Sequence, residues 1–244
     1  MKNAFISGVS TGIGLSLAKQ LLAQGYRVHG VSRREPAELI ADSNFRFCAL
    51  DFADSDAAAQ ALTCFIEREK ISHLSKLFLN VGQFGKRIAP LHKVSVADLE
   101  EMVRVNVWSH KVLLDCLLAQ KVVIQDAVFS SSIAGVRARA GNSGYAITKA
   151  ALNMMAKLYA IENQEIRFLV LGLCSVDTFL SETIGSLPLE GDFPDIIKLR
   201  ERAQDARYLV SADKRAADIL GLLDPAQLDK IPNGDFVEIR TFLA

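Results

Sequence analysis

A tight glycine turn near the start of the chain leaves few folds open to it. Residues 3–7 are typical of a short buried strand, and residues 12–24 carry apolar side chains at helical spacing. Between the two patterns lies the segment Gly8-Val9-Ser10-Thr11-Gly12-Ile13-Gly14. A strand that turns this tightly into a helix directs the free N–H groups and the positive dipole end of the helix at an anion, and glycines let phosphate oxygens approach the backbone. The turn predicts a seat for the pyrophosphate of a dinucleotide, with an ordinary glycine turn as the alternative.

Strand and helix patterns alternate along the rest of the chain, with short polar breaks between them. Strands are expected at residues 3–7, 26–31, 45–50, 75–79, 125–130, 165–172 and 235–240. Helices are expected at residues 12–24, 54–69, 96–120, 144–162 and 212–223, and Asp54 or Ser55 is expected to cap the second of them. This rhythm predicts an α/β protein with a single-domain Rossmann fold, in which a doubly wound parallel seven-stranded sheet is flanked by helices and binds ligands at the carboxyl ends of its strands.

The composition fits one enzyme-sized domain over residues 1–244. Half of the 244 residues are hydrophobic, which is enough to build a substantial core, and nothing resembling a linker divides the chain. The 28 basic residues balance the 28 acidic ones without a basic stripe, so electrostatics support neither a nucleic-acid partner nor an anionic membrane partner. A small-molecule substrate fits better.

The four cysteines show no pairing pattern, and most fall inside apolar runs, at Cys48, Cys64, Cys116 and Cys174. They predict buried thiols in a reducing compartment rather than disulfides or metal ligands, and no metal site is expected. The sequence shows no signal peptide, and no apolar run approaches the roughly 18 residues of a membrane span. We therefore expect a cytoplasmic protein.

Ser132, Tyr145 and Lys149 stand at spacings that can build a proton-transfer site. Tyr145 and Lys149 are four residues apart on an expected helix, so their side chains share one face. An ammonium about 5 Å from the phenol oxygen contributes roughly 3 kcal/mol at an effective dielectric of about 20, which lowers the pKa of Tyr145 toward the working range of an acid–base catalyst. With the glycine turn, these residues suggest a nicotinamide-dependent oxidoreductase acting on carbonyl groups. An amphipathic surface helix is the alternative.

Further segments follow the glycine turn in a particular order. They are Leu79-Asn80-Val81-Gly82, Val105-Asn106-Val107, Ser131-Ser132-Ile133-Ala134-Gly135 and Tyr145-Ala146-Ile147-Thr148-Lys149. Together with the run from Ser7 to Gly14, they make the chain resemble the short-chain dehydrogenase/reductase family, compact single-domain type. The corresponding family motifs are T-G-x-x-x-G-I-G, N-N-A-G, a helix asparagine, and a serine followed by Y-x-x-x-K. The motifs cover about residues 3–178, and length and strand order extend the resemblance over the remainder.

The resemblance implies catalytic roles for Asn106, Ser132, Tyr145 and Lys149. Tyr145 would protonate the carbonyl oxygen during hydride delivery, Ser132 would stabilise the developing alkoxide, and Lys149 would also bind the nicotinamide ribose. Asn106 would hold a water that connects Lys149 to bulk solvent, with a buried helix kink as the alternative. The other residues implied to bind the cofactor are Gly8, Ser10, Thr11, Gly12, Ile13, Gly14, Asp51, Phe52, Asn80, Val81, Gly82, Val176 and Thr178. For Asp51, a loop carboxylate that caps the next helix is the alternative.

The residues after the second expected strand indicate which cofactor the chain prefers. A carboxylate at this point would bind the 2′-hydroxyl of NAD, but the chain has Ser32-Arg33-Arg34. A guanidinium matches a 2′-phosphate through bidentate, charge-assisted hydrogen bonds. We expect NADP(H), with Arg33 as the main contact and Ser32 or Arg34 assisting. Solvated arginines in a surface turn are the alternative.

Some positions depart from the family pattern. The Pro-Gly after the sixth strand is Leu173-Cys174, the glycine three residues after the helix asparagine is Ser109, and the first asparagine of N-N-A-G is Leu79. None of these departures removes a catalytic group, so they put the geometry of cofactor binding in question more than the activity. They also keep open a second function, that of an NADP-binding regulatory or scaffold protein with little or no turnover.

Residues 179–210 are expected to form a lid over the nicotinamide. Its apolar inner face would consist of Phe179, Leu180, Ile184, Leu187, Leu189 and Phe193. Such a face favours an aromatic or aliphatic ketone or aldehyde as the substrate, although the same side chains could equally pack the lid onto its own domain. Arg137 and Arg139, in the loop before Tyr145, either meet an acidic substrate or face solvent.

Two expected helices carry apolar residues beyond a single face. The helices at residues 96–120 and 144–162 include Trp108, Leu152 and Met155 at such positions. Apolar positions of this kind suit pairing between protomers. A homo-oligomer, either a dimer or a tetramer, is therefore expected.

Overall fold

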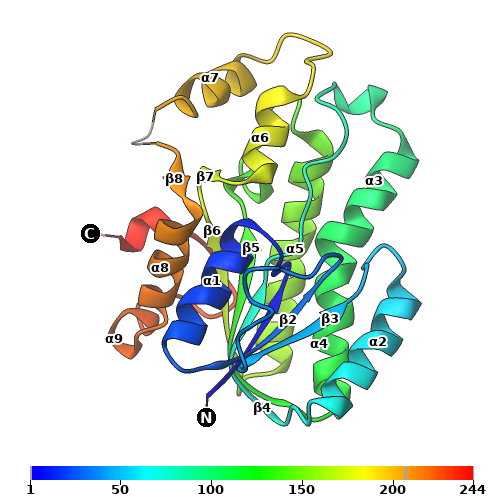
Figure 1. The fold of residues 1–244 in the computed structure, drawn as a ribbon. Coiled ribbons are helices and arrows are strands. Elements are labelled where there is room, and N and C mark those ends of the chain that lie inside the picture. Colours follow the sequence, from blue (N-terminus) through cyan, green and yellow to red (C-terminus); the bar gives the residue numbers. More distant parts are fainter. Residues whose placement is uncertain (1, 206–207, 244) are drawn as a thin grey trace.

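The computed structural model describes residues 2–205 and 208–243, and a parallel sheet forms their centre (Figure 1). The strands of this sheet are β1 (Asn3–Ser7), β2 (Arg27–Ser32), β3 (Phe45–Ala49), β4 (His73–Leu79), β5 (Val123–Ser131), β6 (Arg167–Gly172) and β9 (Phe236–Glu238). They lie in the order β3-β2-β1-β4-β5-β6-β9, and every neighbouring pair is parallel. The order reverses between β1 and β4, at the point where sheets of this kind bind ligands. The predicted doubly wound, seven-stranded Rossmann fold is confirmed.

Helices cover both faces of the sheet (Figure 1). α1 (Gly12–Ala23) and α8 (Ala212–Leu222) pack on one face, and α2 (Ser55–Arg68), α4 (Ser109–Ala119) and α5 (Ser143–Glu162) pack on the other. Successive strand residues point to opposite faces, so in β1 the Phe5 side chain joins the core under α2, while Ala4 and Ile6 join the core under α1. The near-continuous apolar strands of this sequence follow from burial of the sheet on both faces.

Two expected elements differ from the structure. The helix expected at 96–120 is interrupted, because α3 (Val96–Val103) ends in a π-helical segment, Arg104–Trp108, before α4 begins. The strand expected at 235–240 is shorter, because a 3-10 helix, Ile239–Phe242, follows β9 at once. Every other expected strand and helix agrees with the structure to within two residues at each end. Short helical turns also occur at Leu91–Lys93, Ile133–Gly135 and Pro225–Leu228.

The expected lid lies above the carboxyl ends of the strands (Figure 1). It contains α6 (Phe179–Ser186) and α7 (Pro194–Arg202), and a small parallel pair of strands, β7 (Val176–Asp177) and β8 (Val210–Ser211), joins its base. The guanidinium Nε of Arg200 donates a hydrogen bond to the carbonyl of Ile184 (3.0 Å), which fastens α7 to the end of α6. Residues 206 and 207 of the expected lid lie outside the described residues, as do residues 1 and 244 of the expected domain.

The cysteine thiols are unpaired, but they are not all buried. Cys116 is buried, Cys48 and Cys174 are half-buried, and Cys64 is exposed. The prediction of buried thiols is therefore wrong for Cys64. The reason is helical geometry, because α2 turns its Leu62, Phe65 and Ile66 side chains toward the sheet and leaves position 64 on the outside.

The outer face of α5 carries exposed apolar side chains. They are Ile147, Met154, Leu158 and Ile161, which recur at helical spacing, and Trp108 from the π-helical segment is also 46% exposed. Leu152, in contrast, is fully buried and Met155 packs against the same core, so the prediction that these two suit a protomer interface is wrong. Their side chains lie on the face of α5 that meets the sheet.

Candidate active site

The glycine turn joins β1 to α1 in a conformation that depends on glycine. Gly8 and Gly12 have φ angles of 71° and 56°, in the left-handed region. A side chain at Gly14 would place its Cβ 2.1 Å from the carbonyl oxygen of Gly8, so this position must stay bare. Thr11 begins α1 without a side-chain cap, which leaves N–H groups of the first turn available to an anion. These features fit a pyrophosphate.

β5 and α5 bring Ser132, Tyr145 and Lys149 together. Ser132 directly follows β5, and Tyr145 and Lys149 lie one turn apart near the start of α5. The side chain of Ser132 hydrogen-bonds the phenol of Tyr145. The Nζ atom of Lys149 lies 5.6 Å from the centroid of the Tyr145 ring. A hydroxyl, a phenol and an amine, the groups of the expected proton-transfer site, therefore meet at the carboxyl end of β5.

Lys149 is a buried cation. The residue is 4% exposed, and its Nζ donates a hydrogen bond to the carbonyl of Ser130 (2.8 Å). Burial disfavours the charged ammonium and lowers the pKa of Lys149 to about 8. A Cβ at Gly82 would lie 3.7 Å from this Nζ and 3.6 Å from Oδ1 of Asn106. The backbone of Gly82 therefore lies close to both the Lys149 amine and the Asn106 side-chain oxygen.

Tyr145 does not have the lowered pKa that the sequence spacing predicted. Burial raises the pKa of the phenol to about 12, and the hydrogen bond with Ser132 offsets only part of this increase. Tyr145 is 9% exposed and packs against Phe84, with 5.3 Å between the ring centroids. Loss of solvation of the phenolate therefore outweighs the effect of the amine beside the ring. In this structure the phenol is protonated at neutral pH and can donate a proton.

Asn106 lies fully buried in the π-helical segment. Its Oδ1 accepts a hydrogen bond from the backbone N–H of Gln83 (2.7 Å), and its Nδ2 donates to the carbonyl of Gln83 (2.8 Å) and to Oγ1 of Thr148 (3.0 Å). The side chain thereby ties the loop after β4 to α5, next to Lys149. The sequence singled out neither Gln83 nor Thr148 as a site residue. The one feature of the sequence that could have pointed to Thr148 is its position next to Lys149 on an expected helix.

Asn80 and Ser7 link the carboxyl ends of three neighbouring strands. The Ser7 hydroxyl donates to the carbonyl of Phe78 (3.3 Å) and accepts from the N–H of Asn80 (3.2 Å). Oδ1 of Asn80 accepts a hydrogen bond from the Ser130 hydroxyl (2.5 Å). A Cβ at Gly8 would lie 3.4 Å from the backbone nitrogen of Val81. The expected cofactor residues after β4 thus lie between the glycine turn and Lys149.

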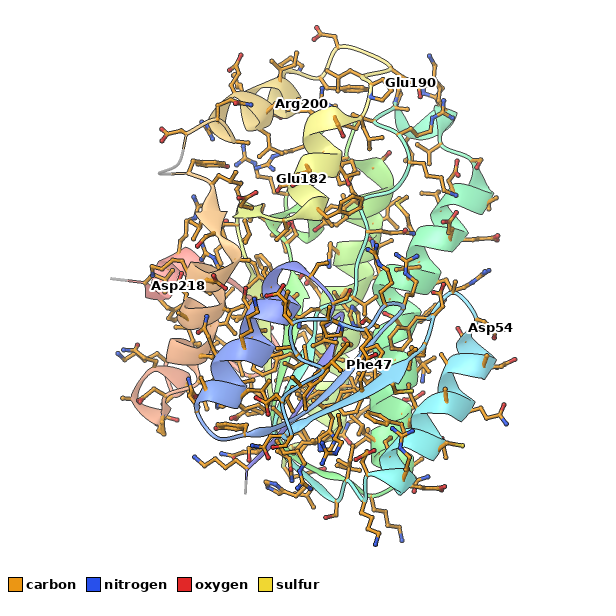
Figure 2. The ribbon with its side chains drawn as sticks, in the orientation of Figure 1. Phe47, Asp54, Glu182, Glu190, Arg200 and Asp218 are labelled. Atoms are coloured by element: carbon orange, nitrogen blue, oxygen red, sulfur yellow. The ribbon has the colours of Figure 1, made fainter. Side chains whose placement is uncertain are left out.

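Asp51 and Phe52 follow β3 near the edge of the sheet. The exposed Asp51 carboxylate accepts a hydrogen bond from the N–H of Ala53 (3.0 Å). The cap of α2 is instead Asp54 (labelled in Figure 2), which accepts from the N–H of Ala57 (3.0 Å). The expected cap at Asp54 is confirmed, and the capping alternative for Asp51 is wrong. Phe52 is 4% exposed and packs in the core, so only its backbone is available to a cofactor.

The turn after β2 presents two exposed arginines. The buried Ser32 hydroxyl donates to the carbonyl of Arg34 (2.7 Å), so this serine holds the shape of the turn. Within residues 2–205 and 208–243, no ion pair or hydrogen bond occupies the guanidinium of Arg33 or Arg34. The nearby Glu38 pairs with Lys19. Both guanidinium groups are available to a phosphate.

The segment after β6 reaches the glycine turn at Thr178. A Cβ at Gly12 would lie 3.1 Å from Cγ2 of Thr178, which also forms a capping box with Ser181 at the start of α6. Val176 is buried two residues earlier. Cys174, which stands where the family has glycine, has a φ angle of 61°. Glycine adopts this left-handed conformation at no steric cost, whereas cysteine adopts it with strain.

The lid packs directly against Tyr145. Its side chains Leu180, Ile184, Leu187 and Leu189 contact a cluster that contains Tyr145, Phe84, Ile88, Phe193 and Ile196. Phe179 is 77% exposed, so the prediction that it belongs to the inner face is wrong. The guanidinium of Arg87 donates to both carboxylate oxygens of Glu190 (2.8 and 2.6 Å), which connects the lid to the loop after β4. Glu190 is labelled in Figure 2.

A small cavity lies beside Tyr145, between the loop after β4, α3 and the start of α5. It measures about 20 Å³, which is room for about one water molecule. Gln83, Phe84, Met102, Asn142 and Tyr145 are among the residues that line it. Oδ1 of Asn142 is buried and has no hydrogen-bond partner among the described residues. The sequence did not point to Asn142, because an asparagine before a helix is ordinarily a cap.

Metal ions and membranes receive no support from the part of the chain that the structure describes. No cluster of His, Cys, Asp or Glu side chains there is arranged to hold a metal ion. None of the helices within residues 2–205 and 208–243 combines the length and the apolarity needed to cross a bilayer.

Comparison with known proteins agrees with this geometry. A family model described as short chain dehydrogenase matches residues 2–186. Benzil reductase ((S)-benzoin forming) from Bacillus cereus is 26% identical, over 98% of this chain and 99% of that protein. NADPH-dependent 1-acyldihydroxyacetone phosphate reductase from Saccharomyces cerevisiae is 28% identical, over 64% of this chain and 54% of that protein. The crystal structure of levodione reductase has the same fold, with a TM-score of 0.80, 22% identity, and coverage of 98% of this chain and 95% of that one.

Proposed function

This chain belongs to the short-chain dehydrogenase family, and we propose that it is an NADP(H)-dependent oxidoreductase that reduces the carbonyl group of a small ketone or aldehyde to an alcohol, or catalyses the reverse reaction. The observation that carries this proposal is the hydrogen bond between Ser132 and Tyr145, with the Lys149 amine 5.6 Å from the phenol ring. The glycine turn, which fits a pyrophosphate, lies at the same end of the sheet.

Each residue of this centre has a distinct task in the proposed reaction. The nicotinamide supplies the hydride when the cofactor is bound. Tyr145, which is protonated at neutral pH because its pKa is raised to about 12, donates its proton to the carbonyl oxygen. Ser132 donates a hydrogen bond to the same oxygen and stabilises its negative charge. The Lys149 ammonium stabilises the phenolate that remains on Tyr145.

The cofactor would be held along the carboxyl ends of β1, β4 and β6. Gly8, Ser10, Thr11, Gly12, Ile13 and Gly14 would bind the pyrophosphate, and the segment Asn80, Val81 and Gly82 would line the path to Lys149. Thr178 would bind the carboxamide, with Val176 supporting it from the core. Asp51 would accept from the adenine amino group, with Phe52 contributing its backbone. Asn106 would hold the water that connects Lys149 to solvent.

Three observations support NADP(H) as the cofactor. Arg33 and Arg34 are exposed and unpaired within the described residues, so a 2′-phosphate would gain charge-assisted hydrogen bonds at little cost. A relative over part of the chain is named as an NADPH-dependent reductase. No carboxylate occupies the end of β2, where NAD would need one.

A small apolar carbonyl compound is the substrate class that the lid supports best. The lid places leucine and isoleucine side chains in the cluster around Tyr145, and a relative over the whole chain is named a benzil reductase. The cavity of about 20 Å³ beside Tyr145 holds no such molecule. Because the lid packs against Tyr145, we expect it to move when substrate enters, and the Arg87–Glu190 pair to shift with it.

The proposal includes one catalytic domain over residues 1–244 in the cytoplasm, assembled as a dimer or tetramer. The exposed apolar row on α5, with Trp108 beside it, supports assembly, because a monomer would leave this row in water.

The second candidate function, an NADP-binding regulatory protein with little turnover, is favoured by the strained Cys174 at a cofactor-binding segment. The two functions differ in whether Tyr145 is needed for turnover.

Loss of NADPH absorbance in the presence of a panel of ketones and aldehydes tests the proposal. We expect turnover, and we expect Tyr145→Phe to lower kcat by about 10³-fold, because it removes the proton donor. Tyr159→Phe is the matched control, since Tyr159 lies on the same helix but bonds Asp115 (2.5 Å) at the surface. Undiminished turnover in Tyr145→Phe would overturn the mechanism. Tight NADPH binding without turnover on the whole panel would favour the regulatory function.

A further inference from the structure

A second cavity lies between the segment that follows β6, the start of α8 and the C-terminal segment. It measures about 260 Å³ and is lined by Cys174, Ser175, Tyr208, Lys214, Arg215 and Arg240, among others. Asp218, labelled in Figure 2 on α8, also lines it. No residue lines both this cavity and the small cavity beside Tyr145. It is therefore a separate site.

Arg215 is the unusual feature of this cavity. The residue is 2% exposed, yet its guanidinium nitrogens Nε and Nη1 have no hydrogen-bond partner among the described residues. Its ion-pair contact with Asp218 is long, at 3.6 Å between Nη1 and Oδ2. Buried guanidinium groups normally have all their donors satisfied, because each unmet donor costs about 1–3 kcal/mol. The described residues leave these two donors of Arg215 without an acceptor.

The charges around Arg215 do not balance. Asp218 serves two cations at once, because its Oδ1 accepts from Lys214 and its Oδ2 faces Arg215. Arg240 is paired with Glu238, with 3.0 Å between Nη2 and Oε1. Among the described residues, these three cations and two carboxylates leave one positive charge in excess at the wall of the cavity.

We propose that this cavity binds a small oxyanion, a phosphate or a carboxylate, through the guanidinium of Arg215. Two adjacent N–H donors of one guanidinium match two oxygens of such an anion, and Lys214 and Arg240 add positive charge at the rim. Tyr208 also lines the cavity. This site is distinct from the pyrophosphate seat, which is made by the glycine turn between β1 and α1.

Titration of the protein with inorganic phosphate, followed by isothermal titration calorimetry, tests the proposal. The double variant Arg33→Ala with Arg34→Ala serves as the starting protein, so that the proposed 2′-phosphate site contributes little. In that background, Lys214→Gln combined with Arg240→Gln should weaken phosphate binding roughly tenfold or more, since it removes two cations at the rim. Both side chains are largely exposed at 65% and 57%, so these changes should leave the fold intact. A parallel titration with acetate distinguishes a carboxylate site from a phosphate site.

The role of Arg215 itself is tested by two variants, one that keeps the positive charge and one that removes it. Arg215→Lys keeps the charge but loses the paired donors, and Arg215→Met loses both, so binding should weaken in that order. A crystal soaked in phosphate should show the anion in this cavity, within hydrogen-bond distance of the guanidinium of Arg215. Affinity unchanged by the Lys214→Gln and Arg240→Gln pair, or an anion found only at the glycine turn, would overturn the proposal. NADPH turnover is not a readout here, so the result is independent of the proposed enzymatic function.

Discussion

Lys149 and Arg33 are two cations assigned to the same proposed cofactor, yet their surroundings are opposite. Lys149 is 4% exposed, donates to the carbonyl of Ser130 and lies among side chains that are already hydrogen-bonded. Arg33 stands in an exposed turn, and within the described ranges its guanidinium has no ion-pair or hydrogen-bond partner. The nicotinamide end of the site is thus organised before any ligand arrives. At the proposed 2′-phosphate end, the hydrogen bonds of the Arg33 guanidinium would form only when the ligand binds.

The two cations differ in how much they cost in the free energy of folding. Burial lowers the pKa of Lys149 from 10.5 to about 8, which corresponds to a cost on the order of 3 kcal/mol in the free energy of folding at neutral pH. Arg33 remains solvated and carries no comparable cost. A preorganised ammonium supports the chemical step, because no reorganisation is needed when charge develops. The exposed guanidinium of Arg33 would act on the choice between ligands rather than on the chemical step.

Replacing the buried amine of Lys149 should have the largest effect on activity. We expect Lys149→Met to lower kcat by about 10³-fold, because the phenolate of Tyr145 loses its stabilising charge. The same change removes the cost of a buried ammonium, so the free energy of unfolding at pH 7 should stay the same or rise by up to about 3 kcal/mol. Activity is measured by NADPH absorbance and stability by urea denaturation.

The pH dependence of stability gives an independent check on Lys149. Between about pH 8 and 10.5 the unfolded chain holds a proton on Lys149 that the folded protein has lost. The unfolded state binds more protons there, so this residue makes stability rise with pH across that window. Lys149→Met should remove this slope, while Lys157→Met, an exposed lysine on the same helix, should retain it. An identical slope in both variants would mean that Lys149 titrates normally.

The exposed end of the site should respond with selectivity alone. Arg33→Ala combined with Arg34→Ala should lower the ratio of kcat/KM for NADPH to that for NADH by roughly 10- to 100-fold, through loss of charge-assisted hydrogen bonds to the 2′-phosphate. The free energy of unfolding should change by less than about 0.5 kcal/mol, because both side chains are solvated. Arg137→Ala, in another exposed loop, is the matched control. An unchanged ratio would mean that neither arginine binds the 2′-phosphate and that both only face solvent.

The sequence predicted those elements whose pattern follows directly from burial or from backbone geometry. The buried strands β1 and β6 carry the continuous apolar runs Ala4–Ile6 and Phe168–Leu171, and Gly8, Gly12 and Gly14 mark a turn that other residues form only with strain or a clash. The π-helical segment Arg104–Trp108 could not be predicted, because one extra residue in a helical turn barely disturbs the apolar spacing. Leu152 and Cys64 show the same limit, since a pattern of apolar residues does not say which face meets the sheet.

The candidate site was predictable in membership but not in electrostatics. Spacing placed Tyr145 and Lys149 on one face of a helix, and the structure brings them together with Ser132. The direction of the Tyr145 pKa shift depends on Phe84 and the lid, which come from distant parts of the chain and remove water from the phenol. Arg215 was overlooked for a related reason, because a charged residue in a polar helix start ordinarily faces solvent.

The hydrogen bond between Ser132 and Tyr145 offers the finest test of how the buried centre is tuned. Burial raises the pKa of Tyr145 to about 12, and Ser132 acts in the opposite direction. Ser132→Ala should therefore raise the phenol pKa further, so that less phenolate forms at any alkaline pH. The measurement is the ultraviolet difference between each protein and its Tyr145→Phe counterpart, which isolates one tyrosine from the others.

This titration also has a defined consequence for stability. Between about pH 10 and 12 the folded protein keeps the Tyr145 proton that the unfolded chain has lost, so this residue makes stability fall as pH rises through that window. Ser132→Ala should extend the window upward. Phenolate that forms below pH 10 in the unmodified protein would show that the Lys149 ammonium outweighs burial. In that case the buried and the exposed cation would act on their partners in the same way, and the contrast between the two ends of the site would fail.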